Sequence, residues 1–295
     1  MMKFSLIVLG LLVVGYAHWL WTGRLAAQAR EDSPPAARQR MVEDQIKARG
    51  IKDEGVLAAM LKVPRERFVP SGVAPFAYAD QALPIGYGQT ISQPYIVAFM
   101  TEALGLEGGE SVLEIGAGSG YAAAVLSRIA GEVYTVERIG QLAEKAASTL
   151  ADLGYHNVHV LHGDGTKGWP EHAPYDGIIV AAGGPSVPES LKEQLKIGGH
   201  LVIPVGRDPK VQELVRVTRI SVNEYTQEDL ADVRFVPLIG EEGWAPTERE
   251  RRPYRAGRPF IPAARETLAQ KIAAAWVPIL DRRKHDRVFR VSRFF

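Results

Sequence analysis

The sequence contains no cysteine, although it is 295 residues long. This absence excludes a disulfide framework, a metal site built from thiolates and catalysis by a cysteine nucleophile. The hydrophobic share of 46% and the charged share of 23% are those of a globular protein. The length allows one large domain or two smaller ones, with a core that needs no covalent support.

The chain also carries little net charge, +1 at pH 7, but this charge is unevenly distributed. Residues 245–295 contain 13 Lys or Arg against 5 Asp or Glu, whereas the other 244 residues contain 22 against 29. We expect a basic C-terminal extension that follows a mildly acidic body. Anionic lipid is a candidate partner for this extension. Nucleic acid is not expected, because stacking aromatic residues are sparse.

A long apolar run lies near the N-terminus, from Phe4 to Ala17, and Trp19 and Trp21 follow it. This pattern predicts a signal or membrane anchor over residues 1–29 and a linker over residues 30–37. Arginines after the run outnumber the basic groups before it, which favours an uncleaved anchor, membrane contact through residues 1–21 and a cytoplasmic body. The alternative is a periplasmic protein, released by cleavage near Ala29.

The body, residues 38–244, alternates helical and strand patterns. Apolar residues at helical spacing between Met41 and Leu61 predict an N-terminal helical layer. Strands are expected at Ser111–Ile115, Glu132–Glu137, His156–His162, Tyr175–Ala182 and Gly198–Val205, and an antiparallel pair at Val211–Ile220 and Asp232–Leu238. The sequence therefore predicts an α/β protein with a doubly wound, mostly parallel sheet.

A glycine-rich turn follows the first of these strands, with Gly116, Gly118 and Gly120 before an alanine-rich helix. Such a turn lets backbone amides approach a nucleotide closely. The glycines alone are also compatible with a dinucleotide such as NAD, so they do not identify the ligand.

Three acids sharpen the choice, because each lies at or near the end of a successive strand. Glu114 precedes the turn, where a carboxylate disfavours a pyrophosphate but suits an amino group or another cation. Glu137 ends the next strand, the position from which a carboxylate binds ribose hydroxyls. Asp164, beside Gly165, is placed to accept an adenine amine. Together these residues favour S-adenosylmethionine over NAD.

A second polar stretch, Tyr87–Val97, sets Gln89, Thr90, Ser92 and Gln93 between glycine turns and the start of a helix. Taken alone, Ser92 or Gln93 could simply cap the helix that begins at Pro94. With its surroundings, the stretch resembles a known family, the protein-L-isoaspartate (D-aspartate) O-methyltransferases, and Gly88–Pro94 is close to diagnostic of it. The resemblance runs from about Arg38 to Leu238 and rests on Arg40–Ile46, Arg67–Pro70, Ala79–Tyr95, Val112–Tyr121, His162–Gly165, Tyr175–Val180 and Arg234–Leu238.

The resemblance implies a Rossmann-like methyltransferase that uses S-adenosylmethionine and acts on isoaspartyl-containing proteins and peptides. It implies Ser92 as the active-site residue, with no metal. The substrate-binding residues that it implies are Gln89, Thr90, Ile91, Gln93, Val236, Pro237 and Leu238. Residues 181–185, Ala-Ala-Gly-Gly-Pro, depart from the run usual in the family, which leaves substrate-side detail open.

Two other functions fit parts of this pattern. A methyltransferase of another carboxylate or of a small molecule would keep Glu114, Glu137 and Asp164 but would not need the loop from Gln89 to Pro94. A non-catalytic isoaspartyl-binding module would keep that loop and bind cofactor without turnover.

Overall fold

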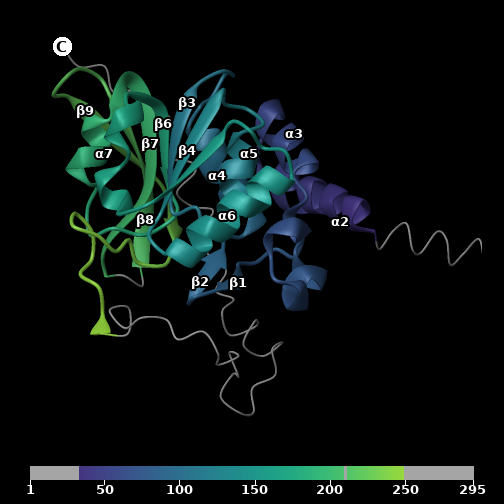
Figure 1. Ribbon diagram of the computed structural model, residues 1–295. Helices are drawn as coiled ribbons and strands as arrows, with labels where there is room; N and C mark the ends of the chain where they lie inside the picture. The colour runs from purple at the N-terminus through teal and green to yellow at the C-terminus, as the bar shows by residue number, and fades with distance from the viewer. Residues whose placement is uncertain (1–32, 209–210, 249–295) are drawn as a thin grey trace, which may run out of the picture.

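A computed structural model describes residues 33–208 and 211–248 of the protein. At its centre is a seven-stranded sheet with the strand order β5-β4-β3-β6-β7-β8-β9 (Figure 1). The strands of this sheet are β3 Ser111–Ile115, β4 Glu132–Glu137, β5 Val158–His162, β6 Tyr175–Val180, β7 Leu195–Asp208, β8 Val211–Arg219 and β9 Tyr225–Val233. A separate antiparallel hairpin pairs β1 Leu83–Gly86 with β2 Gln89–Ile91.

The strand order confirms the doubly wound, mostly parallel sheet. Strands β5, β4, β3, β6 and β7 are parallel, and β8 and β9 are added antiparallel at one edge. From β3 the chain moves outward through β4 to β5, and it then returns to the other side of β3 as β6. This reversal between β3 and β6 is a topological switch point, where open α/β sheets bind their ligands.

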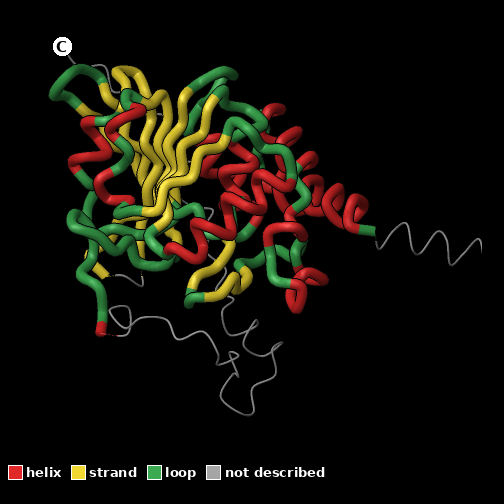
Figure 2. Tube along the Cα trace, viewed as in Figure 1, coloured by secondary structure: helices red, strands yellow, loops and turns green. Residues whose placement is uncertain are grey.

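Helices cover both faces of the sheet (Figures 1 and 2). The α-helices are α2 Pro34–Arg40, α3 Glu54–Lys62, α4 Pro94–Ala103, α5 Tyr121–Leu126, α6 Gly140–Asp152 and α7 Glu189–Glu193. Adjacent residues of β3 show how the faces divide, because side chains alternate along a strand. Val112 belongs to a buried cluster with Met100 of α4 and Leu126 of α5, whereas Leu113 shares a cluster with Leu191 of α7.

The expected N-terminal helical layer is present. A π-helical turn, Met41–Ile46, continues from α2, and its Met41 and Ile46 are fully buried in one core cluster with residues of α3, α4 and α5. The Asp53 carboxylate caps α3 by accepting a hydrogen bond from the amide of Val56 at 2.8 Å. One prediction needs correction, because α2 begins at Pro34 and residues 34–37 are therefore helical and not a linker.

The last strand also differs from its prediction. Residues 232–238 were expected to form it, but the strand that pairs with β8 is β9, Tyr225–Val233, and only its end overlaps the expected range. Most side chains of β9 are partly or fully exposed, so this edge strand lacks the apolar alternation that marks a strand in sequence.

The predicted terminal segments, residues 1–29 and most of 245–295, lie outside the described residues. Within the described ranges, no helix combines the length and the hydrophobicity that crossing a bilayer requires.

Candidate active site

A cavity lies at the carboxyl ends of β3 and β4, beside the switch point, and most of the predicted site residues line it. These are Gln89, Thr90, Ile91, Ser92, Glu114, Gly116, Gly118, Glu137, Gly165, Val236, Pro237 and Leu238. Gly120, Asp164 and Gln93 are not among the lining residues. Segments that are distant in the sequence, from Gln89 to Ile239, therefore meet around one space.

One side of the cavity is formed by the ends of β3 and β4, with Glu114 and Glu137, and by the glycine turn at Gly116 and Gly118. We call this side the sheet wall. Gly116 and Gly118 have φ values of 96° and 54°, in the region that favours glycine. Gly120 instead supports the turn from behind, since a Cβ there would approach Leu150 to 3.1 Å. A Cβ on Gly165 would lie 2.4 Å from the side chain of Ile115, so only glycine fits at that position without rearrangement.

Glu137 is fixed in the sheet wall by backbone amides. Its Oε2 accepts a hydrogen bond from Gly118 N at 2.9 Å, and its Oε1 accepts one from Ile139 N at 2.8 Å. Each carboxylate oxygen can accept more than one hydrogen bond, so acceptor capacity remains for a ligand. The side chain is 6% exposed, which holds it in place at the cavity.

Glu114 is the second acid of the sheet wall, and it is almost completely buried, at 1% exposure. Thr135, its register partner on β4, donates its hydroxyl to Glu114 Oε2 at 2.5 Å. Burial raises the pKa of Glu114 to about 8; the Thr135 hydrogen bond opposes this shift and the charge of Glu137 adds to it. The acid is therefore largely neutral at pH 7 in the cofactor-free protein, and a nearby positive charge would favour its ionisation.

The Asp164 carboxylate caps the short 3₁₀ turn Gly165–Lys167 that follows β5. Its Oδ1 accepts hydrogen bonds from the amide and the hydroxyl of Thr166, at 2.9 and 2.8 Å, and its Oδ2 accepts one from Glu241 N at 2.9 Å. Its carboxylate thus ties the turn at residues 240–243 to the end of β5, while the adjacent Gly165 lines the cavity.

The opposite side of the cavity, which we call the loop wall, begins with the hairpin of β1 and β2. Its turn places Tyr87 and Gly88 at φ values of 53° and 75°. Gln89, Thr90, Ile91 and Ser92 then follow along the cavity. The alternative in which the side chain of Gln93 caps α4 is not realised, because that side chain makes no capping hydrogen bond.

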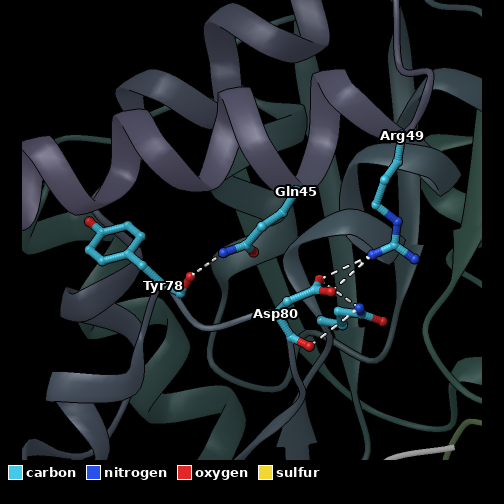
Figure 3. Close-up of polar contacts among 5 residues, drawn as sticks. Gln45, Arg49, Tyr78 and Asp80 are labelled. Carbon is cyan, nitrogen blue, oxygen red and sulfur yellow. Dashed lines mark hydrogen bonds and ion pairs between the residues drawn. The ribbon is translucent and has the colours of Figure 1, made fainter. Parts of the chain in front are cut away.

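Gln93 is directed away from the cavity into a polar cluster. Its Nε2 donates to Asp80 Oδ1 at 2.7 Å, and Asp80 also forms an ion pair with Arg49 at 3.1 Å (Figure 3). Gln45 donates to the carbonyl of Tyr78 at 2.9 Å in the same cluster. The cluster joins the N-terminal helical layer to the segment before the hairpin and to the start of α4.

Residues that follow β6 and β9 complete the loop wall. Gly183 N donates to the Val236 carbonyl and Leu238 N donates to the Gly183 carbonyl, both at 2.8 Å. Trp244 closes this arrangement, since its indole Nε1 donates to the Gly183 carbonyl at 2.9 Å. Residues 236–238 are therefore held beside the end of β6, although they form no regular strand.

Several lining residues were not predicted. These include Val97, Ala117, Ser119, Tyr121, Arg138, Ile139, Ala181, Ala182 and Ile239. A signal was available for Arg138 and Ile139, which directly follow the predicted strand ending at Glu137, and for Ala181 and Ala182, which end the predicted strand beginning at Tyr175. A signal was also available for Tyr121, which directly follows the glycine turn at Gly120, although its contact with Arg65 depends on packing between distant segments.

The site thus combines carboxyl groups on one wall with amide and hydroxyl groups on the other. The sheet wall suits a ligand with positively charged and diol groups, because Glu114 and Glu137 reach the cavity there. The loop wall offers the polar side chains of Gln89, Thr90 and Ser92 to a second, polar ligand. The geometry therefore suits transfer of a group between two bound molecules.

Comparison with known proteins gives a consistent result. Residues 36–243 match the family model described as protein-L-isoaspartate(D-aspartate) O-methyltransferase. Over 224 residues the chain is 66% identical to protein-L-isoaspartate O-methyltransferase 1 of Rhodopseudomonas palustris strain HaA2, covering 76% of this chain and 90% of the relative. It is 59% identical over 207 residues to protein-L-isoaspartate O-methyltransferase 2 of Pelobacter propionicus, covering 70% of this chain and 92% of the relative.

Solved structures of the same enzyme class share the fold. A protein-L-isoaspartate O-methyltransferase structure is 33% identical with a TM-score of 0.64, covering 70% of this chain and 67% of the other. A Plasmodium falciparum structure assigned to the class, in complex with S-adenosyl-L-homocysteine, is 25% identical with a TM-score of 0.59, covering 68% and 98%. The fold and the methyltransferase cofactor predicted from sequence are thereby confirmed.

Proposed function

This chain belongs to the protein-L-isoaspartate(D-aspartate) O-methyltransferase family, and from that premise we propose that it methylates isoaspartyl residues in damaged proteins. The methyl group comes from S-adenosylmethionine, and the acceptor is the free α-carboxylate of an L-isoaspartyl residue or the side-chain carboxylate of a D-aspartyl residue. The observation that carries the proposal is the cavity itself, in which Glu114, Glu137 and the glycine turn face the loop from Gln89 to Ser92.

The donor set of the sheet wall fits S-adenosylmethionine, which when bound supplies a methyl group on a positively charged sulfur. Glu137, held by the amides of Gly118 and Ile139, accepts hydrogen bonds from the ribose hydroxyls. A positive charge on the cofactor would favour the ionised form of Glu114, and the carboxylate would then attract that charge. Gly116, Gly118 and Gly165 leave space that side chains would fill, and Gly120 maintains the turn.

Asp164 remains the proposed contact of the adenine amine. Its carboxylate oxygens already hold Thr166 and Glu241, so this contact uses lone pairs that those bonds leave. Support for this role comes from the position of Asp164 beside Gly165, which lines the cavity.

The substrate needs no general base in this reaction. An α-carboxylate has a pKa of about 3.5, so it is ionised at neutral pH. Ser92 orients this carboxylate toward the methyl group, with Gln89, Thr90 and Ile91 beside it and Val236, Pro237 and Leu238 on the other side. Alignment of the reacting atoms and exclusion of water account for the rate increase. Gln93 acts indirectly, by fixing the loop to Asp80.

The product of this step is a methyl ester at the former α-carboxylate. The neighbouring backbone amide nitrogen then attacks the ester carbonyl and displaces methanol, which gives a succinimide. Water opens this ring at either carbonyl, so that part of the product is normal aspartyl peptide and part is isoaspartyl peptide again. Repeated cycles repair the protein.

The test of this function uses the full-length protein, methyl-labelled S-adenosylmethionine and paired peptides that differ only in an aspartyl or isoaspartyl linkage. Base-labile label confined to the isoaspartyl peptide is the expected result. Binding of S-adenosylmethionine without label on either peptide would instead favour a methyltransferase of another carboxylate, or a binding module without turnover.

For the cellular location, we propose that residues 1–21 tether the enzyme to the membrane with its body in the cytoplasm. The apolar run from Phe4 to Ala17 and the arginines that follow it support this arrangement. Cytoplasmic synthesis of S-adenosylmethionine supports it too. In spheroplasts, the full-length protein should fractionate with membranes and resist added protease, and deletion of residues 1–29 should release it. Degradation in intact spheroplasts would favour the periplasmic alternative, with cleavage near Ala29.

The basic extension adds a second membrane contact in this proposal. Each basic residue near an anionic surface contributes about 1 kcal/mol to binding. Protein without residues 1–29 should therefore bind anionic vesicles, and further truncation at Ala245 should abolish this binding. Equal binding of both proteins would exclude a lipid role for the extension.

A further inference from the structure

Arg65 is a buried cation directly behind the loop wall. It follows Pro64 in a short 3₁₀ turn, and none of its surface is exposed. Its Nε donates to the Ala77 carbonyl and its Nη2 to the Ser92 carbonyl, both at 2.7 Å. The side chain thus holds the backbone of the proposed active-site residue.

The positive charge of Arg65 has no acidic counter-ion within residues 33–208 and 211–248. Among the described residues it takes part in no ion pair, and its Nη1 is buried without a hydrogen-bond partner. Its guanidinium lies over the ring of Tyr121, with 4.7 Å between the Cζ atom and the ring centroid. Burial lowers the pKa of Arg65 and its interactions with tyrosines oppose this shift, but a guanidinium remains protonated in proteins.

An uncompensated buried charge is costly, so holding two carbonyl groups does not explain why arginine occupies this position. A neutral donor such as glutamine could make such hydrogen bonds without placing a charge in the interior. The charge itself therefore needs an explanation, and Ser92 and Tyr121, which Arg65 contacts, both line the cavity.

The cavity has opposite electrostatic requirements at its two walls. Glu114 and Glu137 suit the positively charged cofactor, but they repel the ionised carboxylate of the substrate. Arg65 lies behind the other wall, where its charge attracts that carboxylate through a medium of low dielectric constant. The positively charged cofactor is thus favoured at the sheet wall and the negatively charged substrate at the loop wall.

We propose that Arg65 is a positioning residue whose uncompensated charge draws the substrate α-carboxylate to the Ser92 side of the cavity. The inference rests on the proposed function, because it requires an anionic substrate. It assigns to Arg65 a role in selecting a carboxylate over a neutral group of similar shape. Arg65 acts on the substrate through its field and through Ser92, without touching the substrate.

The decisive readout is charge discrimination. This is the ratio of affinities for an isoaspartyl peptide and for the same peptide with its α-carboxylate converted to the primary amide. Both affinities are measured by calorimetry on the full-length protein saturated with S-adenosylhomocysteine. Arg65→Gln removes the charge but keeps a donor, and we expect it to reduce the ratio about tenfold. Arg65→Lys keeps the charge, and we expect it to retain the ratio within about threefold.

Arg49→Gln is the matched control. Arg49 also supports the loop wall, but its charge is compensated by Asp80 at 3.1 Å. Loss of Arg49 should therefore loosen the loop, with a lower kcat, and leave the ratio unchanged. If Arg65→Gln keeps the wild-type ratio while kcat falls, Arg65 is only a structural support and the inference is wrong.

A measurement on the wild-type protein covers the case in which Arg65→Gln does not fold. The α-carboxylate of the bound isoaspartyl peptide, labelled with ¹³C, should titrate at a lower pKa than in the free peptide. A bound pKa equal to or above the free value would overturn the inference. Methylation of the isoaspartyl peptide by the wild-type protein is checked first, because its failure would refute the proposed function as well.

Discussion

The two walls of the cavity are built in different ways. The sheet wall consists of consecutive strand ends and a glycine turn, and its central acid, Glu137, is fixed by the backbone amides of Gly118 and Ile139. The loop wall is assembled from segments that are distant in the sequence, and side chains such as Asp80 and Arg65 hold it together. Strand order and local backbone contacts position the first wall, whereas the second depends on contacts between segments that are distant in the sequence.

This difference predicts that substitutions in the two walls affect separate measurements. Changes in the sheet wall should weaken cofactor binding, and changes in the loop wall should lower turnover while cofactor binding persists. The following predictions test that separation.

Glu137→Ala should have the largest effect. It removes the acceptor for two backbone amides and for the ribose, and hydrogen bonds to a charged group contribute about 1.5–3 kcal/mol each. We expect affinity for S-adenosylhomocysteine, measured by calorimetry, to fall about 100-fold. Glu132→Ala, at the exposed start of the same strand, serves as the control and should bind normally. An affinity of Glu137→Ala within threefold of wild type would contradict the assignment.

Ser92→Ala should affect turnover alone. Loss of one hydroxyl that bonds to a charged carboxylate costs about 1.5–3 kcal/mol, so we expect kcat to fall about 30-fold while cofactor affinity stays at the wild-type value. Single-turnover methylation of an isoaspartyl peptide, together with cofactor titration, measures both quantities. Equal losses of affinity and turnover would mean that the two walls are not separable at Ser92.

Glu114 makes cofactor binding depend on pH. Its raised pKa of about 8 means that the free protein is largely protonated at this site at pH 7, whereas the bound cation favours ionisation. Binding should release up to one proton below pH 8, and affinity at pH 7 should be about tenfold lower than at pH 9. Calorimetry in buffers of different ionisation enthalpy counts the protons. The cofactor amine also titrates, so Glu114→Gln serves as the control. This substitution should remove the share of the proton release and of the pH dependence that comes from Glu114.

The same pKa has a consequence for stability. Because burial raises the pKa of Glu114 above its unfolded value of 4.5, the folded state binds more protons between pH 4.5 and about 8. The stability of the cofactor-free protein should therefore decline as pH rises through this interval, and Glu114→Gln should flatten the decline. Urea denaturation at several pH values checks the sign. A steeper decline in the variant would refute it.

Asp80→Ala should have the smallest effect. It removes the partner of Arg49 and Gln93, but the ion pair is partly exposed, so its loss costs about 1 kcal/mol or less of folding free energy. We expect a KM for the isoaspartyl peptide about threefold higher and an unchanged affinity for cofactor. Asp152→Ala, on the exposed face of α6, provides the control. Weaker cofactor binding in Asp80→Ala would show that the cluster also supports the sheet wall.

The sequence was most informative where structure depends on topology. β3 and β4 have the predicted bounds, since buried parallel strands are strongly apolar, and the acids at their ends follow from the strand pattern. β9 was misplaced because its polar residues form a strand only by pairing with β8. Arg65 had no local signal, because its contacts with Ala77, Ser92 and Tyr121 join segments that only tertiary packing brings together. Gln93 and Asp164 were predicted to bind the substrate and the cofactor, but neither lines the cavity and the hydrogen bonds of their side chains go to protein groups.

The closure of the loop wall by Trp244 has a consequence for the order in which the enzyme is made. Trp244 and the turn at residues 240–243 hold Gly183 and Asp164 in place, yet they are the last parts of the described body to be synthesised. Domains form as their chain emerges from the ribosome, N-terminal parts first. A nascent chain that already contains every strand of the sheet still lacks this closure, so we expect catalytic competence only after synthesis has passed Trp244.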